Sequence, residues 1–331
     1  MNETWRIIQG DARKLDLPDG SMNMCVTSPP YWGLRDYGHE GQLGLESTPE
    51  QYVANMVEVF REVKRVLRDD GTLWLNIGDS YAGGGGFAPN APTNQARAAG
   101  DKEAWGKFNP AGMDRMSSRI GTGKLAIAAG LKHKDLVGIP WMLAFALRAD
   151  GWYLRQDIIW HKPNPMPESV TDRCTKAHEY LFLLSKSERY YYDNESVSEP
   201  LAQSSVSRLN QDVAGQVGTT RANGGRKTNG NFKAVGDLTT GKRNRRSVWT
   251  VNTRPYRGAH FATFPPALIE PCILAGCPKG GTVLDPFGGS GTTAEVALKN
   301  GRNVVLNELN PEYIKLAEAR IAEATKQGGL W

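Results

Sequence analysis

The chain has 331 residues, of which 40 are Lys or Arg and 35 are Asp or Glu, and 40% are hydrophobic. These proportions are ordinary for a globular protein and exclude a wholly disordered chain. No apolar run approaches the roughly 20 residues that a membrane span needs, and the N-terminal segment is charged where a signal peptide is apolar. Four cysteines without Cys-x-x-Cys spacing indicate neither a disulfide framework nor a metal site. We therefore expect a cytoplasmic protein with no membrane partner.

The net charge of +5 is unevenly distributed along the chain. Residues 205–255 contain ten basic residues against two acidic ones, and the Gly-rich residues 83–135 contain eight against four. The rest of the chain must therefore be acidic on balance. We expect these two basic segments to be poorly ordered without a bound polyanion and to form the two sides of a cleft that holds it.

The first half of the chain alternates predicted strands and helices. An apolar strand at residues 22–27 runs into Ser28-Pro29-Pro30-Tyr31-Trp32, whose prolines end it. Thr48 and Pro49 then predict the start of a helix with apolar residues at helical spacing. We expect residues 69–71 to end that helix before a strand at 72–77. Strand, helix and strand in this order are typical of a parallel sheet.

The alternation resumes after the Gly-rich insert at residues 81–134. The predicted elements are a helix from Pro140, strands at 152–160 and 178–185, a helix at 265–276 bent at Pro271, strands at 282–285 and 303–308, and a last helix capped by Asn310. A basic, Asn- and Gly-rich region at 194–253 interrupts them. Because only one strand–helix unit follows the strand at 282–285, the N-terminal half must supply the remaining strands of the sheet.

A glycine loop follows the strand at 282–285 and predicts a ligand site. Glycines allow a ligand to approach the backbone, and the next helix begins with free N–H groups. Glu308, at the end of the following strand, can accept hydrogen bonds from both hydroxyls of a ribose. The residues that we expect to bind the cofactor here are Asp285, Phe287, Gly288, Gly289, Ser290, Gly291, Thr292 and Glu308.

Three interpretations of this loop compete: an ordinary turn, a dinucleotide site and a site for S-adenosylmethionine. The stretch from Gly289 to Ala294 satisfies G-x-G-x-x-A, a motif that is weak on its own. Asp285 ahead of the glycines favours S-adenosylmethionine, because an acid suits a cationic sulfonium and amino group better than a pyrophosphate.

Two motifs together resemble those of DNA amino-methyltransferases, which methylate exocyclic amines of DNA bases. Residues 27–32 (TSPPYW) resemble the catalytic motif, and residues 285–291 (DPFGGSG) resemble the cofactor motif. The catalytic motif precedes the basic segment and the cofactor motif follows it, as in the beta class. The resemblance covers nearly the whole chain. It implies an S-adenosylmethionine-dependent enzyme acting on double-stranded DNA, and leaves a homodimer and a cognate restriction endonuclease open.

The chemistry of amine methylation explains the residue types of the first motif. The exocyclic amine of cytosine or adenine is a poor nucleophile because its lone pair is delocalised into the ring. Two acceptors, the Ser28 hydroxyl and the Pro29 carbonyl, can localise that lone pair, on a backbone stiffened by Pro29 and Pro30. Tyr31 and Trp32 offer faces for a base flipped out of the duplex. Serine at the first position is typical of enzymes acting on cytosine N4, with adenine N6 as the alternative.

The resemblance also assigns roles outside the two motifs. Asp11 matches the acid that bonds the adenine amine of the cofactor, and Phe261, Thr263 and Pro265 match a segment lining its methionine end. Lys162 lies in a segment found near the target base. Lys242, Arg243, Arg245 and Arg246 are expected to clamp DNA phosphates.

Cys25 and Cys272 are expected to be core thiols. Methylation at cytosine C5 needs a cysteine nucleophile and is therefore not expected.

The expected fold is α/β: a circularly permuted, doubly wound, mostly parallel sheet of the Rossmann-like methyltransferase type. We expect the catalytic half at residues 1–193, a target-recognition region at 194–255 and the cofactor half at 256–331. Two rivals from other classes are an NAD-dependent oxidoreductase using the same glycine loop and a DNA-binding protein without turnover.

Overall fold

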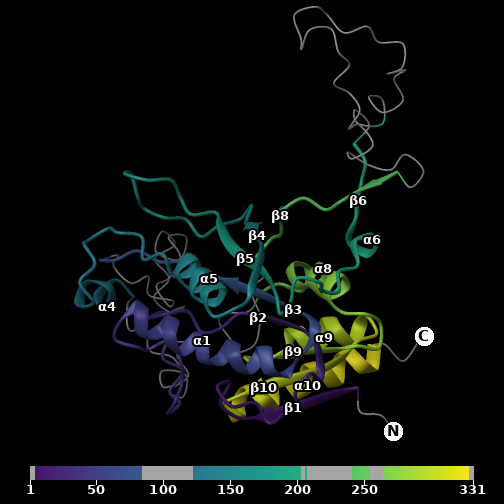
Figure 1. The fold of residues 1–331 in the computed structure, drawn as a ribbon. Helices are drawn as coiled ribbons and strands as arrows, with labels where there is room; N and C mark the ends of the chain where they lie inside the picture. The colour runs from purple at the N-terminus through teal and green to yellow at the C-terminus, as the bar shows by residue number, and fades with distance from the viewer. Residues whose placement is uncertain (1–3, 84–121, 203–205, 207–240, 254–263, 328–331) are drawn as a thin grey trace, which may run out of the picture.

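An eight-stranded, mostly parallel sheet forms the centre of the protein (Figure 1). The computed structural model describes residues 4–83, 122–202, 206, 241–253 and 264–327. In spatial order the strands are β1 (Trp5–Gln9), β10 (Asn303–Glu308), β9 (Thr282–Asp285), β2 (Met22–Thr27), β3 (Leu67–Ile77), β5 (His178–Ser185), β4 (Tyr153–His161) and β8 (Val248–Thr250).

The strands of the two chain halves meet in the middle of this sheet. The five strands from β1 to β3 are parallel to one another, β5 is antiparallel to β3 and to β4, and β8 is parallel to β4. Strand β2 pairs with β3 on one side and with β9 on the other. The C-terminal strands thus join the N-terminal ones, and the expected doubly wound, mostly parallel sheet is confirmed.

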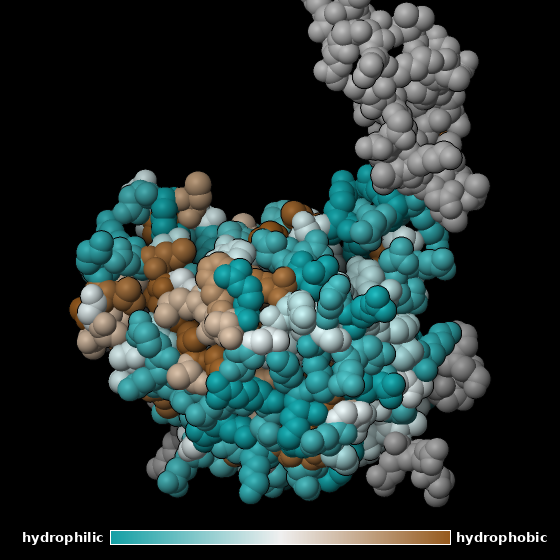
Figure 2. Space-filling view, in the orientation of Figure 1, coloured by the Kyte–Doolittle hydropathy of each residue, from teal (hydrophilic) through white to brown (hydrophobic). Residues whose placement is uncertain are grey.

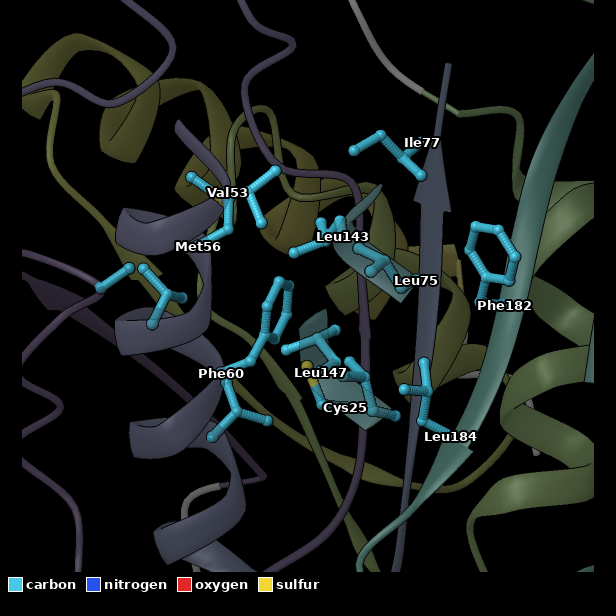
Figure 3. Close-up of a cluster of buried hydrophobic side chains, with 14 of the residues drawn as sticks. Cys25, Val53, Met56, Phe60, Leu75, Ile77, Leu143, Leu147, Phe182 and Leu184 are labelled. Atoms are coloured by element: carbon cyan, nitrogen blue, oxygen red, sulfur yellow. The ribbon is translucent and has the colours of Figure 1, made fainter. Parts of the chain in front are cut away.

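Helices cover both faces of the sheet because the central strands are apolar on both sides. Cys25 of β2 and Leu75 of β3 face a core formed with α1 (Pro49–Val66) and α5 (Ile139–Ala149). Their neighbours Met24 and Trp74 face a second core. That core includes residues of α8 (Pro266–Gly276), α9 (Thr292–Lys299) and α10 (Pro311–Gln327). Alternate side chains of one strand therefore serve opposite cores. Figure 3 shows the first of them.

Helix α1 begins where its sequence predicts. The Thr48 hydroxyl accepts a hydrogen bond from Gln51 N at 3.2 Å, and Pro49 occupies the first turn. Its inward face is fully buried from Tyr52 to Val66. Asn310 caps α10 in the same way, accepting from Glu312 N at 2.9 Å. These local capping signals position two of the helices that cover the sheet.

The structure departs from the predicted elements in two places. Strand β3 begins at Leu67, directly after α1, so residues 69–71 belong to the strand and do not form a turn before it. Leu67 pairs with Met22, while the three residues after it are exposed and polar, which explains why they look like a turn in the sequence. The Gly-rich insert also contains α4 (Thr122–Ala128). Residues 84–121 of that insert lie outside the described residues.

The described part of the basic region contributes four short elements, of which β8 joins the main sheet. They are α6 (Asn194–Val197), β6 (Glu199–Pro200), β7 (Lys242–Arg243) and β8. Strand β8 extends the sheet beside β4, and β6 pairs with β7. Residues 207–240, and with them most of the expected two-sided cleft, lie outside the described residues, so the cleft and the domain boundaries stay predictions.

Apolar side chains gather on the surface over α4 and α5 (Figure 2). Ile127 of α4 and Phe145 of α5 are among the exposed large hydrophobic residues. No helix in the described part of the chain is long and apolar enough to cross a membrane.

Candidate active site

A cavity of about 790 Å³ opens at the carboxyl ends of the parallel strands. The parallel strands all end at the same edge of the sheet, so the residues that follow them come together there. One lining residue lies at the end of each of these strands: Gly10 after β1, Ser28 after β2, Gly78 after β3, Pro286 after β9, and Glu308 of β10. The two predicted motifs therefore share one cavity.

The Ser-Pro-Pro-Tyr segment is anchored from behind. The Pro30 carbonyl accepts a hydrogen bond from the Tyr52 hydroxyl of α1 at 2.9 Å, and the Trp32 indole donates to the Glu46 carbonyl at 2.8 Å. All of Ser28–Trp32 lines the cavity, but the Trp32 side chain is only 2% exposed and packs in the core. Trp32 anchors the motif, while its role as a wall for the base stays a prediction.

Asp285 connects the catalytic strand to the glycine loop and does not line the cavity. It is 2% exposed and accepts hydrogen bonds from the Thr27 hydroxyl at 2.7 Å, the Thr293 hydroxyl at 2.6 Å and Phe287 N at 3.1 Å. Burial raises the pKa of its carboxyl, and these hydrogen bonds oppose the rise. We call this set of four residues the Asp285 bridge. Because Thr27 directly precedes Ser28, the bridge fixes the catalytic motif relative to the loop.

The glycine loop lies tightly on β10 and faces the cavity through Phe287 and Gly289. Gly289 N donates to Glu308 Oε2 at 2.8 Å, and Gly288 N donates to the Asn307 carbonyl at 2.9 Å. A Cβ on Gly288 would lie 2.9 Å from Leu306 Cβ, so only glycine fits there. Burial raises the pKa of Glu308, although its hydrogen bonds from backbone N–H groups oppose the rise.

Other residues of the loop face α10. The Ser290 and Thr292 hydroxyls lie 3.2 and 2.7 Å from Arg320 Nη1, which donates to both. Gly291 has a φ of +79°, and a Cβ on it would lie 3.0 Å from Ala317 Cα. These contacts hold the loop in shape from the side away from the cavity.

Asp11 lines the cavity in the turn after β1. Its carboxylate accepts hydrogen bonds from the backbone N–H and the guanidinium of Arg13, at distances from 2.6 to 3.1 Å. Burial alone would raise the pKa of Asp11, but the hydrogen bonds and charge of Arg13 lower it overall. Asp11 is therefore an ionised acceptor at neutral pH.

The cavity brings together only part of the predicted cofactor set. Asp11, Phe287, Gly289 and Glu308 line it. The predicted residues that do not line it are Pro265, Asp285, Gly288, Ser290, Gly291 and Thr292. Phe261 and Thr263 lie outside the described residues, although the neighbouring Phe264 lines the cavity. Direct contact between these eight residues and a cofactor stays a prediction.

Glu179 and Asn76, which lie outside the predicted motifs, line the cavity beside Tyr31. The Tyr31 hydroxyl donates to Glu179 Oε2 at 2.8 Å, and Lys162 donates to Glu179 Oε1. Burial raises the pKa of Tyr31, and the charge of Glu179 raises it further. A signal was present in the sequence: each residue is a polar group within an apolar strand, TLWLNI for Asn76 and HEYLFLLS for Glu179.

The predicted DNA-binding residues fall into two groups. Lys162 lines the cavity, whereas residues 242–246 do not. Glu199 of β6 pairs with Arg243 at 3.4 Å and with Arg246 at 3.1 Å, and the Arg245 guanidinium lies 4.6 Å from the centroid of the Trp249 ring. These contacts tie the basic cluster to the edge of the main sheet, and phosphate binding by it stays a prediction.

Cys25 and Cys272 are fully buried core thiols, as predicted. Burial raises the pKa of both. Neither thiol is therefore disposed to act as a nucleophile. Within the described ranges, no group of three or more His, Cys, Asp and Glu side chains is arranged to hold a metal ion.

The fold and the cavity define an α/β enzyme whose catalytic motif faces a nucleotide-type glycine loop across one site. The chain belongs to the DNA methylase family, whose model matches residues 22–319. The protein is thus a DNA methyltransferase, and the resemblance of its two motifs is confirmed.

Curated relatives agree with this assignment over nearly the whole chain. Type II methyltransferase M.Cfr9I from Citrobacter freundii is 49% identical over 317 residues, which cover 95% of this chain and 87% of the relative. Type II methyltransferase M.SmaI from Serratia marcescens is 46% identical over 318 residues, with coverages of 96% and 90%.

Solved structures share the fold. The PvuII DNA methyltransferase (cytosine-N4-specific) superposes with a TM-score of 0.58 at 16% identity, covering 98% of this chain and 93% of that one. TTHA0409 from Thermus thermophilus, solved with S-adenosyl-L-methionine, gives a TM-score of 0.54 at 22% identity, with coverages of 96% and 93%. At these identities the likeness concerns the fold.

Proposed function

We propose that this enzyme transfers the methyl group of S-adenosyl-L-methionine to the exocyclic N4 of a cytosine flipped out of double-stranded DNA at a specific site. One observation carries the proposal: Ser28, heading a rigid Ser-Pro-Pro-Tyr segment, lines the same cavity as Phe287, Gly289 and Glu308 of the cofactor half. Amine activation and cofactor binding thus meet in one open cavity.

The cofactor half of the cavity suits S-adenosyl-L-methionine in its residue types. Glu308, at the end of β10, supplies carboxylate oxygens for the ribose hydroxyls, and the ionised Asp11 accepts from the adenine amine. Phe287 offers an apolar face to the nucleoside. Gly289, without a side chain, leaves room for the ligand beside the loop. When bound, the cofactor supplies an electrophilic methyl group on a sulfonium.

The catalytic half makes the amine nucleophilic without a covalent intermediate. The Ser28 hydroxyl oxygen and the Pro29 carbonyl accept hydrogen bonds from the two amine N–H groups and localise the nitrogen lone pair. Tyr52 and the Asp285 bridge hold these acceptors in place, so positioning supplies much of the rate. Tyr31 stacks on the base. Serine in place of an acidic or amide residue at the first motif position supports cytosine N4 over adenine N6.

Mass spectrometry of nucleosides tests the proposal directly. Duplex DNA of mixed sequence is incubated with the enzyme and S-adenosyl-L-methionine, then digested. We expect N4-methylcytosine, which should vanish with Ser28→Ala while cofactor affinity stays within about twofold. N6-methyladenine in the digest would overturn the choice of base. DNA binding without any methylated nucleoside would favour the rival of a binding protein, and tight NAD binding without affinity for S-adenosyl-L-methionine would favour an oxidoreductase.

We extend the proposal to the location of the enzyme in the cell and to its partners. The resemblance to restriction–modification enzymes supports a cytoplasmic enzyme with a cognate restriction endonuclease that cuts the unmethylated site. Resistance of the methylated DNA to lysate nucleases from the same cells tests that partnership. Sedimentation velocity, with and without a cognate duplex, tests the predicted homodimer.

A further inference from the structure

The hydroxyl of Tyr31 is fixed by a carboxylate on a different strand. Tyr31 Oη lies 2.8 Å from Glu179 Oε2 and donates to it. Glu179 is the second residue of β5, on the opposite side of β3 from the strand that leads into the motif. The ring is therefore held at its backbone end by the proline-stiffened segment and at its far end by Glu179. A tyrosine held at both ends keeps its plane, whereas one held only at the backbone can rotate about its side-chain bonds.

Glu179 itself is held by two further donors. Lys162 pairs with its other oxygen, Oε1, and the side chains of this ion pair are only 17% and 16% exposed. The antiparallel register of β4 and β5 places Trp160 opposite Glu179, so Lys162, two residues on, reaches the carboxylate. Its ammonium also lies 4.2 Å from the centroid of the Trp160 ring. Asn76 donates to the Tyr180 carbonyl at 3.1 Å and to Glu179 Oε2 at 3.4 Å.

Gly78 leaves the space that the Tyr31 ring occupies. A Cβ at this position would lie 2.7 Å from Tyr31 Cε2 and 3.3 Å from Glu179 Cδ. Both distances are shorter than ordinary carbon contacts of about 3.5–4.0 Å. The backbone at the end of β3 therefore bounds the ring closely, and Tyr31, Gly78, Glu179, Lys162 and Asn76 all line the cavity.

We propose that Glu179, oriented by Lys162 and Asn76, is a positioning residue that fixes the plane of the Tyr31 ring on which the flipped base stacks. Lys162 then acts through Glu179, in place of the direct DNA or target-loop contact expected from the sequence. The proposal rests on the proposed function, because it assigns these residues a task in the same reaction. Its chemistry does not depend on which base is methylated.

A double-mutant cycle tests the proposal. Glu179→Gln keeps the shape and removes the charge. Tyr31→Phe keeps the ring and the Glu179–Lys162 pair but removes the hydroxyl, and with it the hydrogen bonds to Glu179 and to the Ser28 side chain. Each change should lower kcat/KM for DNA by about 10- to 100-fold, the effect of losing one charge-assisted hydrogen bond that positions a reacting group. The double variant should be no worse than the worse single one. Losses that multiply would overturn the proposal, as would a folded Glu179→Gln variant with wild-type kcat/KM.

Two controls separate positioning from folding. Glu188→Gln changes an exposed glutamate just beyond the far end of β5 and should leave kcat/KM unchanged. Affinity for S-adenosyl-L-methionine should stay within about twofold in the Glu179 and Tyr31 variants, since the cofactor residues lie on other strands. Because Glu179→Gln leaves Lys162 without its partner and can destabilise the fold, Tyr31→Phe carries the test if that variant unfolds.

A fluorescent cytosine analogue at the methylated position gives a readout that requires no turnover. Stacking on a fixed Tyr31 ring should quench the flipped analogue, and Glu179→Gln should restore part of its emission. Equal quenching in both proteins would refute the positioning role. If the protein transfers no methyl group but shows the expected difference in quenching, the proposed function is refuted. The positioning role of Glu179 is supported in that case.

The salt dependence of DNA binding distinguishes the two roles of Lys162. If it acts through Glu179, Lys162→Gln should lower kcat/KM by about the same factor as Glu179→Gln, with an unchanged slope of log affinity against log salt. A slope reduced by about one, with kcat unchanged, would make Lys162 a phosphate contact and overturn its part in the proposal.

Discussion

Thr27→Val removes one hydrogen bond from the Asp285 bridge without changing the shape of the side chain. Thr27 is fully buried, and its hydroxyl donates to Asp285 at 2.7 Å. Water cannot replace the lost donor, because Asp285 is itself 2% exposed. A hydrogen bond to a carboxylate contributes about 1.5–3 kcal/mol. We therefore expect the free energy of unfolding to fall by about 2 kcal/mol, and cofactor affinity to fall as well, since the bridge also holds Phe287 N.

Urea unfolding followed by tryptophan fluorescence measures the loss, and calorimetric titration measures cofactor affinity. Thr282→Val is the matched control: Thr282 begins β9, the strand that ends in Asp285, and its hydroxyl makes no hydrogen bond within the described residues. The control should lose less than about 0.5 kcal/mol, as for a change without a buried partner. If Thr27→Val loses no more than Thr282→Val does, the hydrogen bond from Thr27 to Asp285 contributes nothing to stability.

Three further predictions concern the cofactor site, the loop and the thiols. Burial raises the pKa of Glu308 above its ordinary 4.5, so the carboxylate is protonated at a higher pH than a free glutamate. Cofactor affinity should therefore fall as the pH drops through that pKa. Calorimetry of the Glu308→Gln variant should show that this pH dependence is removed. Gly291→Ala should lower the free energy of unfolding by about 2–3 kcal/mol, since it adds a contact of 3.0 Å to the strain of positive φ. Gly280→Ala is also at positive φ but has nothing within 4 Å, so it should cost about 1 kcal/mol in the same urea assay. Equal losses in the two variants would contradict the clash at Gly291. Cys174 is the one exposed thiol of four, and burial raises the pKa of Cys277 to about 12. A thiol reagent should therefore label one cysteine in the native protein and four in denaturant. Labelling of a second cysteine in the native protein would show that the core opens.

Strands and caps were predictable where the signal is local. Residues 22–27 and 282–285 are apolar runs ended by Ser-Pro-Pro and Asp-Pro, and both became strands with these bounds. Thr48 and Asn310 predicted the starts of their helices, because a helix cap depends on only a few neighbouring residues. The start of β3 was missed for the opposite reason. Its exposed Arg68, Asp69 and Asp70 carry no apolar pattern, and only the pairing of Leu67 with Met22 makes them part of a strand.

The site was predictable in its motifs but not in the direction that each side chain takes. Asp285 was expected to face a ligand, yet its three partners, Thr27, Phe287 and Thr293, come from β2, the loop and α9. The Glu179–Lys162 pair depends on the register between β4 and β5, which a single sequence does not specify. The sequence specifies that Lys162 is positively charged, but only the fold determines which anion pairs with it.

The position of β2 between β3 and β9 has a consequence for how the protein is made. Thr27 and its partner Asp285 are 258 residues apart, so at a synthesis rate of about 5–20 residues per second the ribosome makes the second roughly 13–52 s after the first. Throughout that interval the edge of β2 that will pair with β9 has no neighbour, which favours mispairing. The active site closes late in biogenesis, and a nascent chain cannot modify DNA before its two halves have met.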